Sequence, residues 1–560
     1  MAAVMKTSGL AGLLTGAVAL GVAELTAAVT GPNGAPVIAV GETAINLTPV
    51  PVKEFAIAHF GTHDKAALIA GILMLLAAFA ALIGVLAVRR LAYGLAALGV
   101  FAAVGVAAAV SQGGGLNVVP TLAGTAVAAA TLVLMVRAIR GMARPETAGL
   151  AERTRLAEGT GPMKGTGLAE GTGLAEGTEP VEGTGLAEGT GLAERTGLAG
   201  GPGGKGLERR RFLVVGAGAA ALGVAAGGLG NALLGRFSVA SSRAAVRLPG
   251  PAVPAPAVSA GTDLRIPGLT PFMTSNASFY RVDTDLVLPQ VSPETWTLTI
   301  DGMVDRPVEL TFAELLKMPL TEADITLVCV SNEVGGTYNG NAAWLGVPLA
   351  GLLRRAGVRA GADQVLSAAT DGMTISTPVA AIMDGRNALL AVGMNGQPLP
   401  VAHGFPARMI VPGLYGYVSA TKWVTKLTLT TFARQKAYWT QRGYSAQAPI
   451  KTESRIDVPK PLSQVEAGRI TVAGVAWAPA KGIAKVEVSA DNGPWQKATL
   501  AASGGIDTWR QWMWGWDARP GLHNLRVRAT DNSGATQTPQ RAYPVPNGAS
   551  GWDSVVVTVM

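Results

Sequence analysis

Five long apolar segments constrain this chain more than any other feature of its sequence. They cover residues 8–30, 66–88, 91–111, 118–136 and 212–234. Each is close to the roughly 20 residues that a helix needs to cross a bilayer. Only 15% of the 560 residues are charged, and so low a fraction argues against both a disordered chain and a purely soluble one. We therefore expect a multi-pass membrane protein.

The positions of the arginines predict how these segments cross the membrane. Basic residues lie after the second and fourth segments and before the fifth: Arg89, Arg90, Arg137, Arg140, Arg144 and Arg209–Arg211. Basic loops tend to stay in the cytoplasm, and an alternating path satisfies all of these placements at once. We expect a multi-pass protein of the cell membrane whose residues after about 240 lie on the extracytoplasmic side.

A low-complexity region separates the fourth apolar segment from the fifth. Residues 165–200 nearly repeat the hexapeptide GTGLAE, which cannot bury enough surface to offset its ordering entropy. We expect a bundle of four transmembrane helices over residues 1–137 and a flexible cytoplasmic linker over 138–208. The fifth helix, 209–235, begins with RRRFL, which resembles a twin-arginine export signal; ordinary basic flanking of a span is the alternative.

The second half of the chain has the pattern of soluble domains. After a linker at 236–262, strand-like and short helical runs alternate over 263–440, which predicts an α+β domain. From about residue 450 the pattern is β throughout, with Gly, Asn and Pro turns between short strands. This spacing predicts a small β-sandwich over 441–560.

One cysteine is present in the whole chain, so no intramolecular disulfide can form. Cys329 follows a hydrophobic run and opens a polar, Gly-containing loop, ITLVCVSNEVGG. A lone buried cysteine is usually a small hydrophobe. Its chemical alternatives are a nucleophile or the single protein ligand to a metal that a cofactor carries. A zinc site would need more cysteines or clustered histidines.

A second segment with chemical potential is PLPVAHGFPARMIVPGLYGY, which contains His403 and Arg408. Its glycines and prolines favour an irregular backbone that can approach a large ligand closely. An arginine can grip a phosphate with two hydrogen bonds. A Cys–His catalytic pair stays open, but the spacing favours a His and an Arg that bind an anionic cofactor together.

These segments resemble the sulfite oxidase family of molybdopterin-dependent oxidoreductases, in its membrane-anchored bacterial form. Residues 394–423 are similar to that family's pterin-binding segment almost position for position. The Cys-x-x-Asn spacing from Cys329 to Asn332 is similar to the loop that supplies the molybdenum thiolate. The runs NASFYR (276–281) and WLGVPL (344–349) also match family signatures. The resemblance extends over roughly residues 270–555.

The resemblance implies a molybdopterin-binding catalytic domain at 263–440 and an immunoglobulin-like β-sandwich, of the dimerisation type, at 441–560. It implies molybdenum and molybdopterin as cofactors, with Cys329 as the metal ligand and catalytic centre. Eight residues are expected to bind the cofactor: Asn276, Phe279, Tyr280, Asn332, Ser376, His403, Arg408 and Lys422. The reaction it implies is oxygen-atom transfer to or from a small molecule.

Two positions depart from the pattern of sulfite-oxidising members. Those members carry an arginine right after the Asn of the cysteine loop, where this chain has Glu333. A tyrosine is expected beside the metal, and alignment on 376–378 places Met373 there. A carboxylate in an anion site repels a dianion. We therefore expect a sulfoxide or a related oxo compound rather than sulfite.

The remaining expectations concern partners. His59 and His63 lie before the second apolar segment, and no CxxCH motif is present for covalent haem. We therefore expect a separate electron carrier, haem or quinone-linked. No basic run is interleaved with aromatic residues, so nucleic acid is not an expected partner despite the net charge of +8. The resemblance implies a homodimer through the C-terminal domain. The alternative is a binding protein that keeps the fold without the cofactor.

Overall fold

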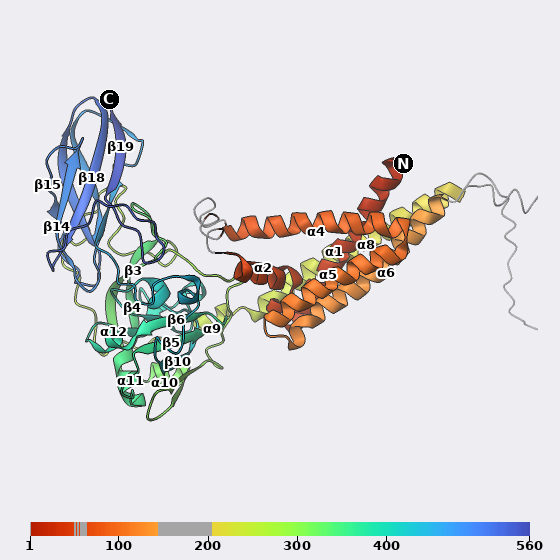
Figure 1. Ribbon diagram of the computed structural model, residues 1–560, viewed down its shortest axis with the longest axis horizontal. Coiled ribbons are helices and arrows are strands. Elements are labelled where there is room, and N and C mark those ends of the chain that lie inside the picture. The colour runs from red at the N-terminus through yellow and green to blue at the C-terminus, as the bar shows by residue number, and fades with distance from the viewer. Residues whose placement is uncertain (1, 50–51, 53–54, 56–63, 144–203) are drawn as a thin grey trace, which may run out of the picture. The chain divides into compact units, whose positions relative to one another are not determined.

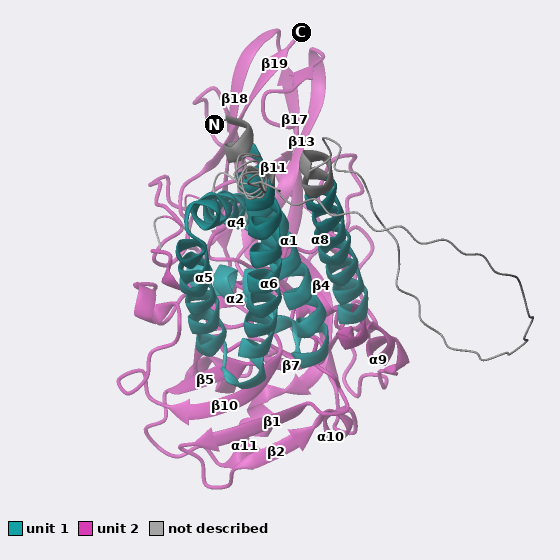
Figure 2. Ribbon diagram, turned by 90° about the vertical axis from the view of Figure 1, so that its right-hand side faces the viewer, with its two compact units in different colours: residues 1–44, 60–234 teal, residues 45–59, 235–560 magenta. Residues whose placement is uncertain are grey.

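The computed structural model describes residues 2–49, 52, 55, 64–143 and 204–560. The chain divides into two compact units (Figures 1 and 2). One is helical and comprises Met1–Ala44 and Phe60–Leu234, and the other comprises Ile45–His59 and Gly235–Met560. The hexapeptide repeat, His59 and His63 lie outside the described residues.

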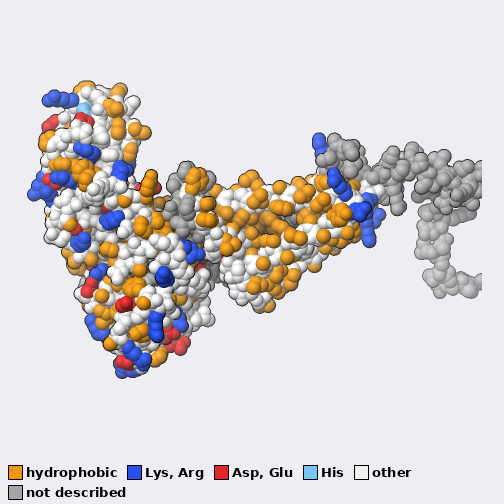
Figure 3. Space-filling model, in the orientation of Figure 1, with side chains coloured by type: hydrophobic (Ala, Val, Ile, Leu, Met, Phe, Trp, Pro, Cys, Tyr) orange, Lys and Arg blue, Asp and Glu red, His pale blue; other side chains and the backbone are white. Residues whose placement is uncertain are grey.

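Five helices of the described chain are long and apolar enough to cross a membrane. They are α1 (Ala2–Thr30), α4 (Asp64–Arg89), α5 (Leu91–Ser111), α6 (Val119–Ala143) and α8 (Gly204–Leu234). Apolar side chains cover the outer surface of this unit, and basic side chains gather at one end (Figure 3). Because a soluble helix buries its apolar stripe, apolar outer surfaces of this kind suit contact with lipid.

The ends of α6 and α8 differ from the sequence-based expectation. α6 continues to Ala143 and α8 begins at Gly204, so helix extends into both ends of the stretch predicted as a linker at 138–208. The apolar pattern stops earlier than the helix because the terminal turns carry polar and basic residues that reach water. Near one end Arg140 Nη2 donates to the carbonyl of Ala87 at 3.2 Å.

Helix α1 is the centre of the helical unit and packs against α4, α6 and α8. Glycines permit these close approaches. A Cβ on Gly12 would lie 1.9 Å from the carbonyl oxygen of Ala80, and one on Gly84 would lie 2.1 Å from that of Ser8. Small residues at helix contacts are typical of membrane bundles, where van der Waals packing holds the helices together.

The first soluble domain contains two five-stranded sheets. One has the order β3-β4-β7-β8, with β9 also paired to β7, and the other has the order β2-β1-β10-β5-β6. Their strands are β1 (Thr297–Gly302), β2 (Val308–Thr311), β3 (Thr321–Val328), β4 (Asn339–Pro348), β5 (Gln364–Ala369), β6 (Thr374–Pro378), β7 (Leu389–Met394), β8 (Gln397–Pro398), β9 (Arg408–Ile410) and β10 (Val424–Thr430). Short helices α10 (Phe312–Leu316), α11 (Leu349–Ala356) and α12 (Val379–Met383) cover them.

The C-terminal residues form two further sheets that enclose a core of their own, which includes Val472, Trp512 and Val527. The orders are β11-β13-β17-β16 and β12-β19-β18-β14-β15. The strands are β11 (Glu453–Val458), β12 (Gln464–Val465), β13 (Gly468–Trp477), β14 (Ile483–Ala490), β15 (Gln496–Lys497), β16 (Thr499–Leu500), β17 (Arg510–Ala518), β18 (Gly521–Asp531) and β19 (Asp553–Val559). The immunoglobulin-like type of this sandwich stays a prediction.

The stretch predicted as a linker at 236–262 is instead held against the first soluble domain. It contains the short helix α9 (Ala240–Ala245). Arg243 donates from Nε to the carbonyl of Leu399 at 2.7 Å and from Nη2 to that of Pro398 at 2.6 Å. Val253 forms a β-bridge with Thr321. Pro and Ala composition suggested a tether, but side-chain and edge-strand hydrogen bonds fix the backbone.

We expect Gly84→Leu to destabilise the helical unit, because its side chain would collide with backbone of α1. Overpacking of this kind typically costs about 1–3 kcal/mol. The measurement is thermal unfolding of the full chain in detergent. Gly71→Leu is the matched control, because a Cβ on Gly71 in the same helix meets no atom within 4 Å. Equal losses in the two variants would contradict the proposed crossing of α1 and α4.

Candidate functional site

Cys329 lies immediately after β3, at the start of a turn that leads into β4. Its side chain is buried, and its N–H donates to the carbonyl of Tyr338 at 2.9 Å. Burial raises the pKa of the thiol, while hydrogen bonds from Ser331 lower it. A strand end of this type holds a side chain rigidly and can still present it to a ligand.

Asn332 braces the turn that follows the cysteine. Its N–H donates to the carbonyl of Cys329 at 3.0 Å, and its Oδ1 accepts from the N–H of Tyr338 at 2.8 Å. Its Nδ2 is buried and has no hydrogen-bond partner. A buried donor without a partner is uncommon, and a missing ligand is one of its ordinary explanations.

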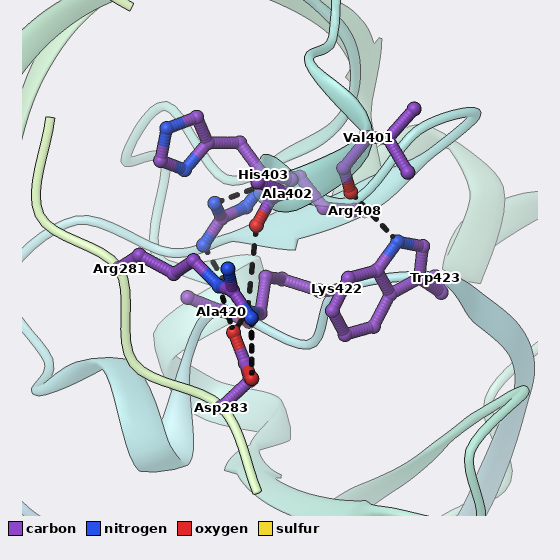
Figure 4. Close-up of polar contacts among 9 residues, drawn as sticks. All are labelled: Arg281, Asp283, Val401, Ala402, His403, Arg408, Ala420, Lys422 and Trp423. Atoms are coloured by element: carbon purple, nitrogen blue, oxygen red, sulfur yellow. Dashed lines mark hydrogen bonds and ion pairs between the residues drawn. The ribbon is translucent and has the colours of Figure 1, made fainter. Parts of the chain in front are cut away.

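Arg408 on β9 is a buried cation. It donates from Nη1 to the carbonyl of His403 at 3.1 Å and from Nη2 to that of Ala420 at 3.3 Å (Figure 4). Its guanidinium carbon lies 5.2 Å from the centre of the Trp344 ring. Nε is buried without a partner. Burial lowers the pKa of Arg408 to about 10, so the group stays charged at neutral pH.

His403 lies beside this cation. Its Nε2 is 3.2 Å from the main-chain oxygen of Asn276, and its ring meets that of Phe279 edge-on with centroids 5.5 Å apart. Burial, and then the charge of Arg408, lower the pKa of His403 to about 4. The imidazole is therefore neutral at pH 7.

Lys422 belongs to a second group of charges next to His403. Its Nζ lies 3.1 Å from Oδ2 of Asp283, and that same oxygen lies 2.6 Å from Nε of Arg281 (Figure 4). The ammonium group of Lys422 lies over the Trp423 ring, with Nζ 4.4 Å from its centre. Burial lowers the pKa of Lys422 to about 8, although Asp283 opposes that shift.

Tyr280 connects the cysteine to the buried cations. Burial of its hydroxyl raises its pKa far above the usual value; Cys329 raises it further, and Arg408 lowers it. A Cβ on Gly416 would lie 3.9 Å from that hydroxyl and 3.8 Å from the carbonyl of Val328. Residues from four separate parts of the chain therefore meet around Tyr280.

The structure brings together six of the eight residues expected to bind the cofactor: Asn276, Phe279, Tyr280, His403, Arg408 and Lys422. Asn332 lies in the turn of Cys329, and its described contacts are with the main chain of that turn. Ser376 on β6 is buried in the other sheet, with no contact to these residues among those described above. Its strand does approach the chain near Val418, because Thr377 Oγ1 donates to that carbonyl at 2.7 Å.

Two members of the site were not found from the sequence. Asp283 joins Lys422 to Arg281, and the Trp344 ring faces the guanidinium of Arg408. Trp344 stood inside a recognised signature, WLGVPL, so its position could have been noticed. Asp283 lies in the irregular stretch at 282–290, and no sequence pattern marks it as a partner of Lys422, which lies 139 residues later.

Known proteins with similar sequences indicate the class of protein that contains a site of this type. Residues 285–439 match the oxidoreductase molybdopterin binding domain. Mitochondrial sulfite oxidase of Mus musculus is 28% identical over 344 residues, which is 52% of this chain and 62% of that protein. Nitrate reductase [NADH] 1 of Oryza sativa subsp. japonica is 32% identical over 196 residues, which is 30% of this chain and 21% of that protein.

Among solved structures, the sulfane dehydrogenase SoxCD of Paracoccus pantotrophus aligns with a TM-score of 0.46 and 24% identity, over 52% of this chain and 84% of that chain. The chain spans less than two thirds of the length of the curated relatives named above. The fold and site define a molybdopterin-type oxidoreductase domain. These matches confirm the expected resemblance to the sulfite oxidase family of molybdopterin-dependent oxidoreductases.

We expect His403 to make the protein sensitive to acid. Its pKa in the folded chain, about 4, lies below the ordinary 6.5, so the unfolded chain takes up the proton first as the pH falls. Stability from this residue is complete above pH 6.5 and is lost towards pH 4, by up to about 3 kcal/mol. His403→Gln should flatten the decline of unfolding free energy across that window.

His523→Gln is the control for this measurement. Asp491 pairs with His523 and raises its pKa, so removal of this ring takes away stability at low pH and steepens the decline. Both variants keep every carboxylate of the parent, so the titration of the carboxylates does not distinguish them. A His403→Gln protein whose acid sensitivity equals that of the parent would contradict a neutral, buried imidazole.

Proposed function

We propose that this chain is a membrane-anchored oxidoreductase that transfers an oxygen atom at a molybdenum bound to Cys329. The observation that carries the proposal is a pair of buried donors without partners: Nε of Arg408, and Nδ2 of Asn332 in the turn that Cys329 opens. Buried donors of this kind, one on a cation and one in the turn of a soft thiol, suit a metal-bearing anionic cofactor better than they suit a hydrophobic core.

The donor set fits a phosphorylated pterin. Arg408 and Lys422 supply positive charge, and the neutral His403 supplies a hydrogen bond to the same anion. The unpartnered Nε of Arg408 and Nδ2 of Asn332 are donors that such a ligand would satisfy. Within the described chain, no group of three or more His, Cys, Asp or Glu side chains could hold a metal alone. This supports a metal that is carried by the cofactor.

The bound molybdenum supplies two-electron oxygen-atom exchange. The chain supplies the surroundings for that chemistry. Cys329 must lose its proton to become a ligand, against the burial that raises its pKa, and a metal cation provides that driving force. Tyr280 keeps its proton at neutral pH, because its pKa lies far above the usual value. Its hydroxyl can therefore donate a hydrogen bond at the reacting centre.

Glu333 bears on the choice of substrate. Its side chain is exposed and lies in the turn right after Asn332. A negative charge at this place discourages a dianion such as sulfite and leaves neutral molecules unaffected. We propose a sulfoxide or a related neutral oxo compound as the substrate class.

The apolar helices support a membrane anchor, and the basic end of the helical unit supports a cytoplasmic side there, with the catalytic domain on the extracytoplasmic side. The five apolar segments contain no histidine to ligate haem. We propose that electrons pass through a separate carrier, haem or quinone-linked, and that the C-terminal sandwich supports a homodimer.

We expect Cys329→Ser to fold with a melting temperature close to that of the parent, to lose molybdenum and to lose turnover. A serine hydroxyl is a poor ligand for a metal that prefers soft thiolate. The measurements are metal and pterin content and oxygen-atom transfer to a sulfoxide, on protein from a cofactor-competent host. Val328→Ala, which shortens the neighbouring buried side chain, is the control and should retain molybdenum.

Full turnover by Cys329→Ser would refute the ligand assignment. Parent protein without molybdenum, purified from the same host, would favour the rival function of a cofactor-free binding protein.

We expect the parent to oxidise sulfite poorly and Glu333→Arg to lower KM for sulfite. Reversal of one charge near a dianion at a partly exposed site should lower KM for that dianion roughly tenfold. Steady-state kinetics with sulfite and with a neutral sulfoxide separates a charge effect from general damage. Glu466→Arg, the same charge change in the sandwich, should leave both KM values unchanged. A high kcat/KM for sulfite in the parent would overturn the choice of a neutral substrate.

A further inference from the structure

Strand β11 (Glu453–Val458) opens the C-terminal sandwich and is buried along nearly its whole length. Residues alternate across a strand. Ile456 belongs to the core of the sandwich. The alternate positions Glu453, Arg455 and Asp457 are all buried as well. A buried edge strand with three buried ionisable side chains at every second position has more than a packing role, because an unpaired buried charge is costly.

Arg455 uses every nitrogen of its guanidinium. Nε donates to Oδ1 of Asp457 at 2.7 Å, and Nη2 donates to Oγ1 of Thr270 at 3.0 Å. Nη1 reaches the cysteine turn: it donates to the carbonyl of Gly336 at 2.6 Å and to Oδ1 of Asn339 at 3.0 Å. One side chain of the sandwich therefore holds two points of the segment that begins at Cys329.

A second contact from the sandwich reinforces the first. Asp553 on β19 accepts from the N–H of Ile456 at 2.8 Å. A Cβ on Gly335 would lie 2.5 Å from Oδ1 of this carboxylate, so the turn passes directly against it. Gly335 has a φ of +79°, which a glycine adopts without strain.

Inside the turn, Asn332 braces the two ends through hydrogen bonds with the main chain of Tyr338 and Cys329. We propose that Arg455 is a positioning residue for the metal ligand: it clamps residues 329–339, so that the C-terminal sandwich sets the orientation of the Cys329 sulfur. The part of this inference that concerns the metal rests on the proposed function.

A guanidinium is suited to this task because its donors point in fixed directions in one plane. A lysine could neutralise Asp457 but could not also reach Gly336 and Asn339. Loss of Arg455 leaves a buried carbonyl, a buried amide oxygen and a buried carboxylate short of a donor. The turn is expected to open locally more often, with little change in the two hydrophobic cores.

The first test uses full-length protein in detergent, made in a host that cannot produce the pterin. Because Cys329 is the only cysteine, its alkylation by iodoacetamide reports on this turn alone. Arg455→Lys should speed alkylation on the order of tenfold, as expected for local opening after a buried charged hydrogen bond is lost. Arg469→Lys on β13 is the matched control, because its ion pair with Asp517 is exposed, and it should not change the rate.

A double replacement tests whether faster alkylation could result from general unfolding instead of local opening of the turn. Arg455→Met with Asp457→Leu removes both charges together and leaves no unpaired ion in the core. This double variant should also alkylate faster while it keeps the melting temperature of the parent. Rates equal to the parent in every folded variant would overturn the clamp. A faster rate that appears equally in Arg469→Lys would overturn it too.

The second test uses protein from a cofactor-competent host. If Arg455 orients the sulfur, Arg455→Lys changes the electron paramagnetic resonance spectrum of the one-electron-reduced molybdenum and lowers kcat more than it changes KM. An unchanged spectrum would overturn the link to the metal. If the parent holds no molybdenum, the proposed function fails, and the alkylation rates still decide whether Arg455 holds the turn.

Discussion

The interaction on which the soluble unit depends is the burial of positive charge at Arg408. A guanidinium inside a protein needs acceptors, and here two main-chain carbonyls and the face of Trp344 surround it. Those carbonyls belong to the irregular stretch around His403 and Ala420, so the charge and the loop fix one another. The unpartnered Nε leaves one direction open to an anion. Burial, and then the charge of Arg408, lower the pKa of His403; burial also lowers the pKa of Lys422, with a smaller contribution from Arg408.

Much of this arrangement could be predicted from the sequence, because the strongest signals are local. Apolar length predicted five long helices, and regular turns predicted the C-terminal strands. A dense Gly and Pro segment with one His and one Arg identified the cation site. Contacts between segments that are distant in the sequence could not be predicted, because no local pattern indicates them. Asp283 looks like any loop aspartate until Lys422 lies beside it, and Arg455 looks like an ordinary strand residue until β11 packs against the cysteine turn.

The stretch before the catalytic domain shows how composition can mislead. Pro and Ala at 249–258 are typical of a tether, but the hydrogen bonds of Arg243 and the bridge from Val253 hold this backbone on the domain. Propensity describes what a segment does alone, and tertiary hydrogen bonds decide what it does in place. Helix α6 also continues past its apolar segment, and Arg140 in that continuation donates to the carbonyl of Ala87.

The single sulfhydryl of the chain has a consequence for its behaviour towards oxidants and reductants. A chain with one cysteine cannot form an intramolecular disulfide. The stability of its folded state therefore does not depend on an oxidising compartment and is not lowered by reductants. Oxidants could act on it only by converting Cys329 to a sulfenic acid or by joining two molecules, and both require an exposed thiolate. Burial in the turn and a raised pKa oppose both reactions. The fold itself therefore protects the sulfur of Cys329 from oxidation.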